Sequence, residues 1–123
     1  MSIQKTKDVT INDREFRIGL VSARTGDWIL TRMLSRTSSD FETYSKIQDL
    51  LLGTCSIYKT VQDGTRVPMK LYEDGRWLIR DEDLEYDTDT IHALCDAVLG
   101  FNFDPFFEKL KARAAAQIQA TPQ

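Results

Sequence analysis

Phe101-Asn102-Phe103-Asp104-Pro105-Phe106-Phe107 places four aromatic rings within seven residues. Burying one phenylalanine side chain stabilises a protein by roughly 1.5 to 3 kcal/mol, so four together reach about 6 to 12 kcal/mol, comparable to the net stability of a small domain. The segment therefore forms either core or contact surface, and the sequence leaves both open. Four bulky rings across a helix-to-helix break cannot all point one way, so at least one is expected to be accessible unless another subunit or a partner covers it.

Helix signals flank this segment on both sides. Apolar residues recur at helical spacing between residues 91 and 98, which predicts a helix from about Asp87 to Leu99 that ends at Gly100. Asp104-Pro105 supplies an N-cap and a first helical residue, so a fourth helix is expected to reach about Ala116, with Asn102 as an alternative cap. Residues 117–123 are polar or small and are expected to fray.

The N-terminal part predicts a strand pair followed by two helices. Apolar and polar residues alternate over 8–11 and 15–20, the pattern of a short hairpin. The first helix should run from Ser22 or Asp27 to about Arg36, and the second from Asp40 to Leu52. Ser39 and Glu42 form a capping-box signature at the start of the second helix, and Gly53 offers a left-handed residue at its end.

The middle of the chain predicts strands. Apolar residues alternate with polar ones between residues 55 and 79, which indicates two hairpins in a meander. Asp63-Gly64 and Asp74-Gly75 supply the positive φ of tight turns, and Pro68 lacks a ladder donor and so predicts an edge strand. The expected fold class is α+β, with about four helices, an N-terminal β-hairpin, a central antiparallel β-meander, and a single domain over 1–116.

Composition and charge exclude several classes of protein. No apolar run approaches the roughly 20 residues that span a bilayer, and the N-terminus lacks the apolar region of a signal peptide, so we expect no membrane partner and a cytoplasmic location. Residues 1–60 carry nine Lys/Arg against seven Asp/Glu, and residues 61–123 carry seven against twelve. The acidic stretch 81–89 would repel a phosphate backbone, and no basic stripe compensates it, so nucleic acid is not an expected partner.

No motif announces catalysis or a cofactor. His92 is the only histidine, so no nucleophile and base arrangement is supported, and Cys55 and Cys95 are expected to be buried small hydrophobes. A calcium loop starting at Asp81 would need glycine at its sixth position and glutamate at its twelfth, where the chain has Tyr86 and His92. No glycine lies in a phosphate-binding pattern. We therefore expect no enzyme, no catalytic residue, no cofactor and no metal.

Three segments, taken in order, resemble a known family. They are the hairpin Val9 to Ile18, the following helix with Gly26 and Trp28, and the closing stretch Leu94 to Phe107 with its Phe-Asn-Phe. This order resembles the tail assembly chaperones of long-tailed bacteriophages and prophages, over about half of the chain; the stretch Thr54 to Ile79 departs from those mostly helical proteins. The resemblance implies a non-catalytic protein of the host bacterial cytoplasm that binds the tape-measure protein and helps tail-tube protein assemble around it.

The resemblance makes the aromatic segment the first candidate for partner contact. The expected contact residues are Phe101, Phe103, Phe106 and Phe107, with Trp28 second. A chaperone for a long apolar helix needs exposed apolar surface on an acidic body, with helix-in-groove contacts as the default mode. A structural virion component, such as a tail-terminator or head-to-tail connector protein, is the alternative; a homo-oligomer stays open for both, and a small hydrolase is a third, less supported class.

Overall fold

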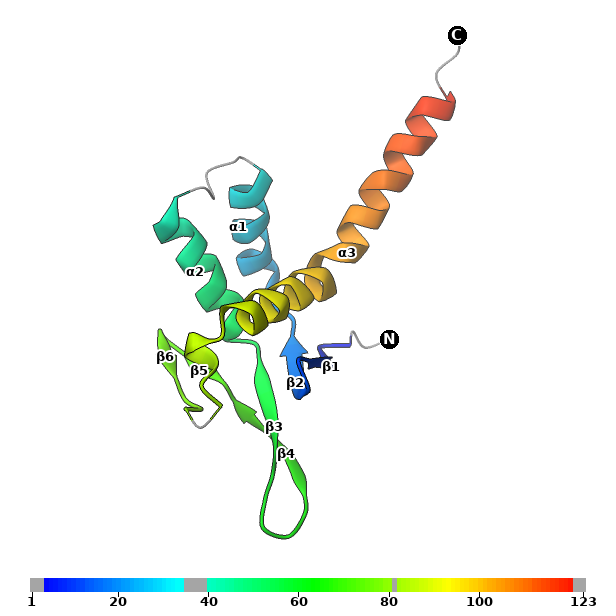
Figure 1. The fold of residues 1–123 in the computed structure, drawn as a ribbon. Coiled ribbons are helices and arrows are strands. Elements are labelled where there is room, and N and C mark those ends of the chain that lie inside the picture. The colour runs from blue at the N-terminus through cyan, green and yellow to red at the C-terminus, as the bar shows by residue number, and fades with distance from the viewer. Residues whose placement is uncertain (1–3, 35–39, 81, 121–123) are drawn as a thin grey trace.

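An antiparallel sheet of four strands, in the order β1-β2-β3-β4, organises the fold. The computed structural model describes residues 4–34, 40–80 and 82–120, and within them the chain is an α+β protein (Figure 1). The sheet consists of β1 (Thr6–Ile11), β2 (Arg14–Gly19), β3 (Ser56–Thr60) and β4 (Arg66–Lys70). The expected N-terminal hairpin is confirmed, since β1 pairs with β2 from Thr6 opposite Gly19 to Ile11 opposite Arg14.

Tight turns join the strands where the sequence predicted them. Gly64, in the turn between β3 and β4, has a φ of +86°, and Gly75, between β5 (Tyr72–Glu73) and β6 (Arg76–Trp77), has a φ of +81°. Both predicted central hairpins are thus present. They do not form one meander, because β5 and β6 pair only with each other and make a separate two-stranded ribbon.

Two helices lie between the hairpins in the sequence. Helix α1 covers Ala23–Leu34 and α2 covers Phe41–Leu52, close to the predicted bounds. The N-cap of α2 is Asp40, whose carboxylate accepts a hydrogen bond from the Glu42 backbone N–H; Ser39, the predicted cap, lies outside the described residues. Gly53 has φ −63° and ψ −15°, so the predicted left-handed terminus is wrong and the end of α2 stays right-handed.

The last helix differs most from the prediction. A short 3-10 turn, η2 (Leu84–Tyr86), leads into α3, which runs without a break over Thr88–Ala120. The described residues therefore contain three α-helices rather than about four. Proline at position 105 removes one backbone donor without ending the helix, and α3 changes direction where its colour turns from yellow to orange in Figure 1. The helix passes the predicted end at Ala116; residues 121–123 lie outside the described part.

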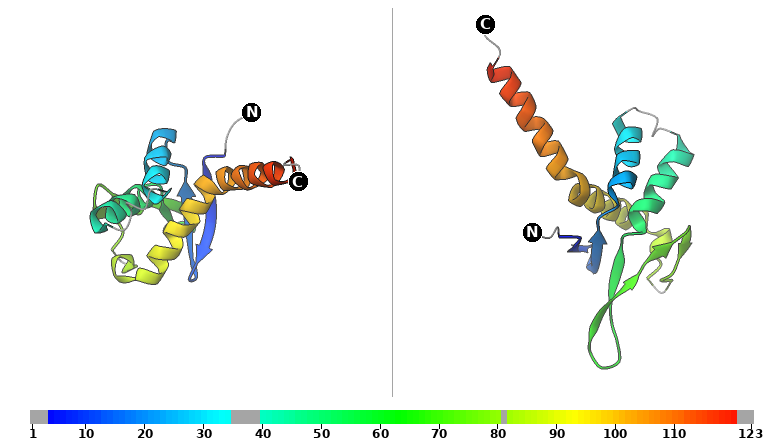
Figure 2. Two further views of the ribbon diagram at one scale, coloured as in Figure 1. Left: turned by 90° about the horizontal axis from the view of Figure 1, so that it is seen from above. Right: turned by 180° about the vertical axis from the view of Figure 1, so that it is seen from behind.

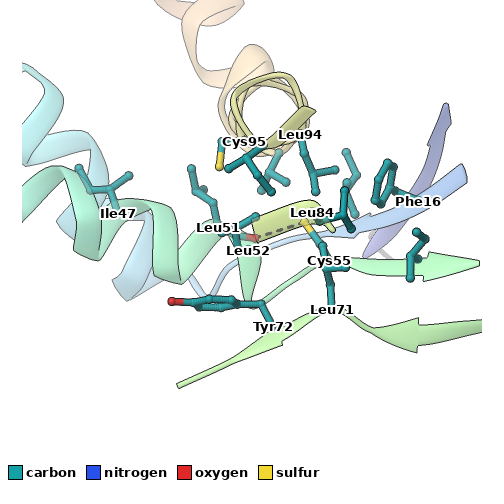
Figure 3. Packing of buried hydrophobic residues seen from close by; sticks show 14 of the residues in the cluster. Phe16, Ile47, Leu51, Leu52, Cys55, Leu71, Tyr72, Leu84, Leu94 and Cys95 are labelled. Carbon is teal, nitrogen blue, oxygen red and sulfur yellow. Dashed lines mark hydrogen bonds between the residues drawn. The ribbon is translucent and has the colours of Figure 1, made fainter. Parts of the chain in front are cut away.

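The core lies between one face of the sheet and the first half of α3, with α2 closing one side (Figure 3). Phe16 from β2, Leu51 from α2 and Leu94 from α3 are almost fully buried there. The Cys55 thiol donates to the Leu51 carbonyl oxygen at 3.5 Å, which joins the end of α2 to the start of β3. Burial of this single cluster, rather than propensity, holds the three elements together.

The opposite face of the sheet is charged. The Arg66 guanidinium lies 3.9 Å from the ring centre of Tyr58, and the Tyr58 hydroxyl donates to Asp8 at 2.7 Å. Arg66 also pairs with Glu15 at 2.8 Å. Since β4 is an outer strand, Pro68 lies at a sheet edge as predicted, where its missing N–H costs least. One apolar and one polar face are typical of an antiparallel sheet.

Candidate partner-binding site

The four phenylalanines of the aromatic segment have different surroundings. Phe103 is 6% exposed and belongs to the core, while Phe101 and Phe107 are half-buried and pack against it. Phe106 is 44% exposed and meets Phe107 edge-on, with ring centres 5.4 Å apart. The segment is therefore both core and accessible surface. Phe103 and Phe106 lie three residues apart and thus on nearly the same face of the helix. Their exposures differ because α3 changes direction near Pro105 and carries the following residues away from the body (Figure 1).

Asn102 fastens α3 to the link between β2 and α1. Its side-chain oxygen accepts from the Val21 backbone N–H at 2.9 Å, and its amide nitrogen donates to the carbonyl oxygens of Gly19 at 3.1 Å and Val98 at 2.8 Å. Next to it, a Cβ added to Gly26 would lie 3.4 Å from the Phe103 ring. An added Cβ would make ordinary van der Waals contact there, so α1 packs directly against the Phe103 ring at Gly26. The Phe-Asn-Phe segment thus acts as a clamp on the N-terminal part.

Trp28 lies on α1 and is half-buried against the core. The Arg32 guanidinium lies 4.6 Å from the ring centre and the Lys46 ammonium, from α2, lies 5.2 Å from it. The ring is thus covered by cations of the same chain, and it stands on a different helix from the phenylalanines. These contacts favour a role in joining α1 to α2 over a role as free contact surface.

The part of α3 beyond Pro105 stands away from the body, and we call residues 106–120 the arm. Figure 2 shows the arm extending outward in both views. Leu110 is 48% exposed and lies one turn beyond Phe106 and Phe107, which makes an apolar stripe. Lys109, Lys111 and Arg113 flank it and have no ion-pair partner among the described residues. Sequence reasoning missed Leu110, although the predicted fourth helix already places it three and four residues after Phe107 and Phe106, and this spacing was the available signal.

A groove runs between α2 and α3 on the other side of the body, and we call it the α2–α3 groove. Its central hollow has a volume of about 220 Å³ and is lined by apolar Ile47, Leu51, Cys95 and Leu99 and by polar Tyr44, Gln48, His92 and Asp96. A second hollow of about 320 Å³ shares Tyr44, Gln48 and His92 and adds Asp49 and Glu85. Among the residues that the structure describes, no lysine or arginine lines either hollow. The groove thus has an apolar floor and an acidic rim.

A hydrogen-bonded chain crosses the groove where the two hollows meet. The Tyr44 hydroxyl lies 3.2 Å from Nε2 of His92, and Gln48 donates to the same hydroxyl at 3.0 Å. Tyr44 and His92 were not predicted as site residues. The available signal was weak, since in the sequence Tyr44 recurs with apolar residues at helical spacing in α2 and His92 lies beside the apolar positions of α3.

Two carboxylates of the acidic stretch, Glu82 and Asp87, have a structural role. Arg14 pairs with Glu82 at 3.2 Å and with Asp87 at 3.0 Å, and Lys59 also binds Glu82. The contact with Lys59, followed by that with Arg14, lowers the pKa of Glu82. Hydrogen bonds from Thr90, followed by one from Arg14, lower the pKa of Asp87. These carboxylates anchor the start of α3 to the sheet.

Both cysteines are buried, and possible metal ligands do not gather in the described part of the chain. Burial raises the pKa of the Cys55 and Cys95 thiols to about 12, so both stay protonated near neutral pH. The described residues contain no group of three or more His, Cys, Asp or Glu side chains placed to hold a metal ion. Nor do they include a helix long and apolar enough to cross a membrane.

Similarity to known proteins gives no family for this arrangement. Comparison of the chain with protein-family models, with curated proteins and with solved structures yields no match. The clamp, the arm and the groove are therefore the features from which a function can be proposed.

Proposed function

We propose that the protein is a tail assembly chaperone of a long-tailed bacteriophage or prophage. In this role it acts without catalysis in the host bacterial cytoplasm, binds the tape-measure protein and assists assembly of the tail-tube protein around it. Contact with the client comes from the apolar stripe of the arm, in which Phe106 and Leu110 are exposed and Phe107 is half-buried, rather than from all four phenylalanines.

One observation carries the proposal: the segments on which the family resemblance rests meet in space. Asn102 bonds to Gly19 at the end of the N-terminal hairpin and to Val21 before α1, and Phe103 lies against Gly26. The order of motifs along the chain thus corresponds to one interlocked unit. The support for the proposal is that the three segments of the resemblance pack together as one part of the molecule.

The arm suits a helical client. It presents Phe106 and Leu110 to solvent on a helix that projects from the body (Figure 1). An amphipathic helix can pack along such a stripe through contacts at positions i, i+3 or i+4, and i+7. Exposed apolar surface of this kind marks sites of protein interaction. A long apolar helix would bury that surface, and the client would remain soluble while bound.

Coexpression with the tape-measure protein of the same genome tests the proposal. The wild-type chain should raise the soluble fraction of the tape-measure protein, and the Phe106→Ala, Phe107→Ala double variant should not. Phe41→Ala, which alters a phenylalanine 76% exposed on α2, is the matched control and should behave as wild type. If the double variant keeps its fold by circular dichroism and still solubilises the client, the contact assignment is wrong. No effect of the wild-type chain itself would refute the function.

A structural virion component is the second candidate, and the β3–β4 hairpin favours it. That hairpin reaches away from the body, and β4 pairs on one side only (Figure 1). A free strand edge offers a template for pairing with a neighbouring subunit, although Pro68 weakens this one. Mass spectrometry of purified particles separates the two candidates: a chaperone is absent from finished particles, whereas a tail-terminator or connector protein is present in stoichiometric amount.

A further inference from the structure

The arm and the α2–α3 groove are complementary in shape and in charge. The arm is an amphipathic helix, and residues 106–123 carry three Lys/Arg against one Asp/Glu. The preceding stretch 61–105 carries four against eleven. The groove has an apolar floor, carboxylates at both ends and no lysine or arginine among its described lining residues.

We propose that the arm of one copy docks in the α2–α3 groove of a second copy of this chain. Phe106 and Leu110 would pack on the apolar floor near Ile47 and Leu99, as an amphipathic helix packs in a groove. Lys109, Lys111 and Arg113 would face Glu85 and Asp96. These charges have no ion-pair partner among the described residues, so docking pairs groups that the single chain leaves unpaired.

The arm cannot reach the groove of its own chain. Asp96 and Leu99, which line the groove, lie on the same helix only seven to ten residues before Phe106. A helix folds back on itself only after a break of several residues, and α3 has none. In both orientations of Figure 2 the arm also points away from α2. The groove is therefore available only to the arm of another molecule.

Each copy offers one arm and one groove, so reciprocal exchange about a two-fold axis gives a closed dimer. The association buries apolar surface and pairs exposed charges, and hence it should weaken as salt screens the charges. The dimer would bury Phe106 and Leu110, which we also assign to the client, so docking and client binding compete for the arm. The inference goes beyond the proposed function, because it concerns self-association and needs no tape-measure protein.

Sedimentation velocity of the full chain over a wide concentration range, at low and high salt, is the test. Wild type should form a dimer whose dissociation constant rises with salt. The Lys109→Glu, Lys111→Glu, Arg113→Glu variant should weaken the dimer by more than about tenfold. Lys5→Glu, Lys7→Glu, Arg24→Glu changes net charge equally at exposed cations outside the arm and should leave the dimer intact.

A charge swap gives the decisive comparison. The groove variant Glu85→Lys, Asp96→Lys should also weaken the dimer. A chain that carries both this groove reversal and the triple arm reversal should form the dimer again. A wild-type chain that stays monomeric at every concentration refutes the proposal, and so does a dimer that the arm reversal leaves unchanged. Circular dichroism of each variant checks folding, and Leu110→Asp is a second arm variant if the triple change unfolds the chain. A monomer that still solubilises the tape-measure protein refutes only the dimer, and a dimer without that activity refutes only the proposed function.

Discussion

Asn102 shows how one side chain sets the direction of a whole helix. Replacing it with alanine removes hydrogen bonds to Val21, Gly19 and Val98 and leaves two backbone groups in the β2–α1 link without partners. We predict that Asn102→Ala lowers the free energy of unfolding by about 2 to 3 kcal/mol. Urea denaturation of the variant and of wild type measures this change in the free energy of unfolding. Gln62→Ala, at an exposed position in the β3–β4 turn, should change stability by less than about 0.5 kcal/mol; equal effects would mean that the clamp contributes nothing.

The carboxylates that hold α3 to the sheet predict a loss of stability in acid. The folded state lowers the pKa of Glu82 and Asp87, so their contribution is complete above an ordinary pKa of about 4 and is lost as the pH falls through the lower folded values. In urea titrations, wild type should exceed Glu82→Gln at neutral pH, and the gap should close below about pH 4. Glu108→Gln, on the exposed arm, should show no such closing gap.

Most elements were predictable because local signals and tertiary packing agree in them. Asp-Gly at residues 63–64 and 74–75 requires a left-handed glycine whatever the surroundings, and both turns form as expected. Helix α3 was mispredicted because Gly100 and Pro105 are local signals of a break, and packing overrides them. Phe101, Phe103 and Phe107 contact the core from both sides of the predicted helix break. Continuing the helix keeps all three contacts, which offsets one lost backbone hydrogen bond.

A continuous α3 and two separate helices predict different changes in the free energy of unfolding for the same two substitutions. In a continuous helix, Pro105→Ala restores a backbone donor and should raise the free energy of unfolding by about 1 to 3 kcal/mol. Asp104→Ala, at an exposed mid-helix position, should change it by less than about 0.5 kcal/mol. If Asp104 were an N-cap and Pro105 a first helical residue, both changes would be destabilising. Thermal and urea denaturation distinguish the two.

At the scale of the molecule, the sequence predicted where aromatic rings would gather but not which of them would be buried and which exposed. Aromatic density pointed to residues 101–107, yet only the helix direction decides that Phe103 is core and Phe106 is exposed. The α2–α3 groove was beyond prediction, because it arises where two helices distant in sequence meet and where carboxylates from both line one rim. No periodicity within either helix contains that information.

The division between body and arm predicts that the arm is dispensable for folding. Every fully buried core residue lies at or before Phe103, and residues 108–116 are exposed. A short exposed helix is marginal by itself, so it adds little to the stability of the body. A chain ending at Glu108 should therefore unfold cooperatively with a Tm within about 4 °C of wild type, while losing part of its far-ultraviolet helical signal. A chain ending at Leu99 lacks Asn102 and Phe103 and should not fold. If the chain ending at Glu108 also fails to fold, the arm must pack against its own body.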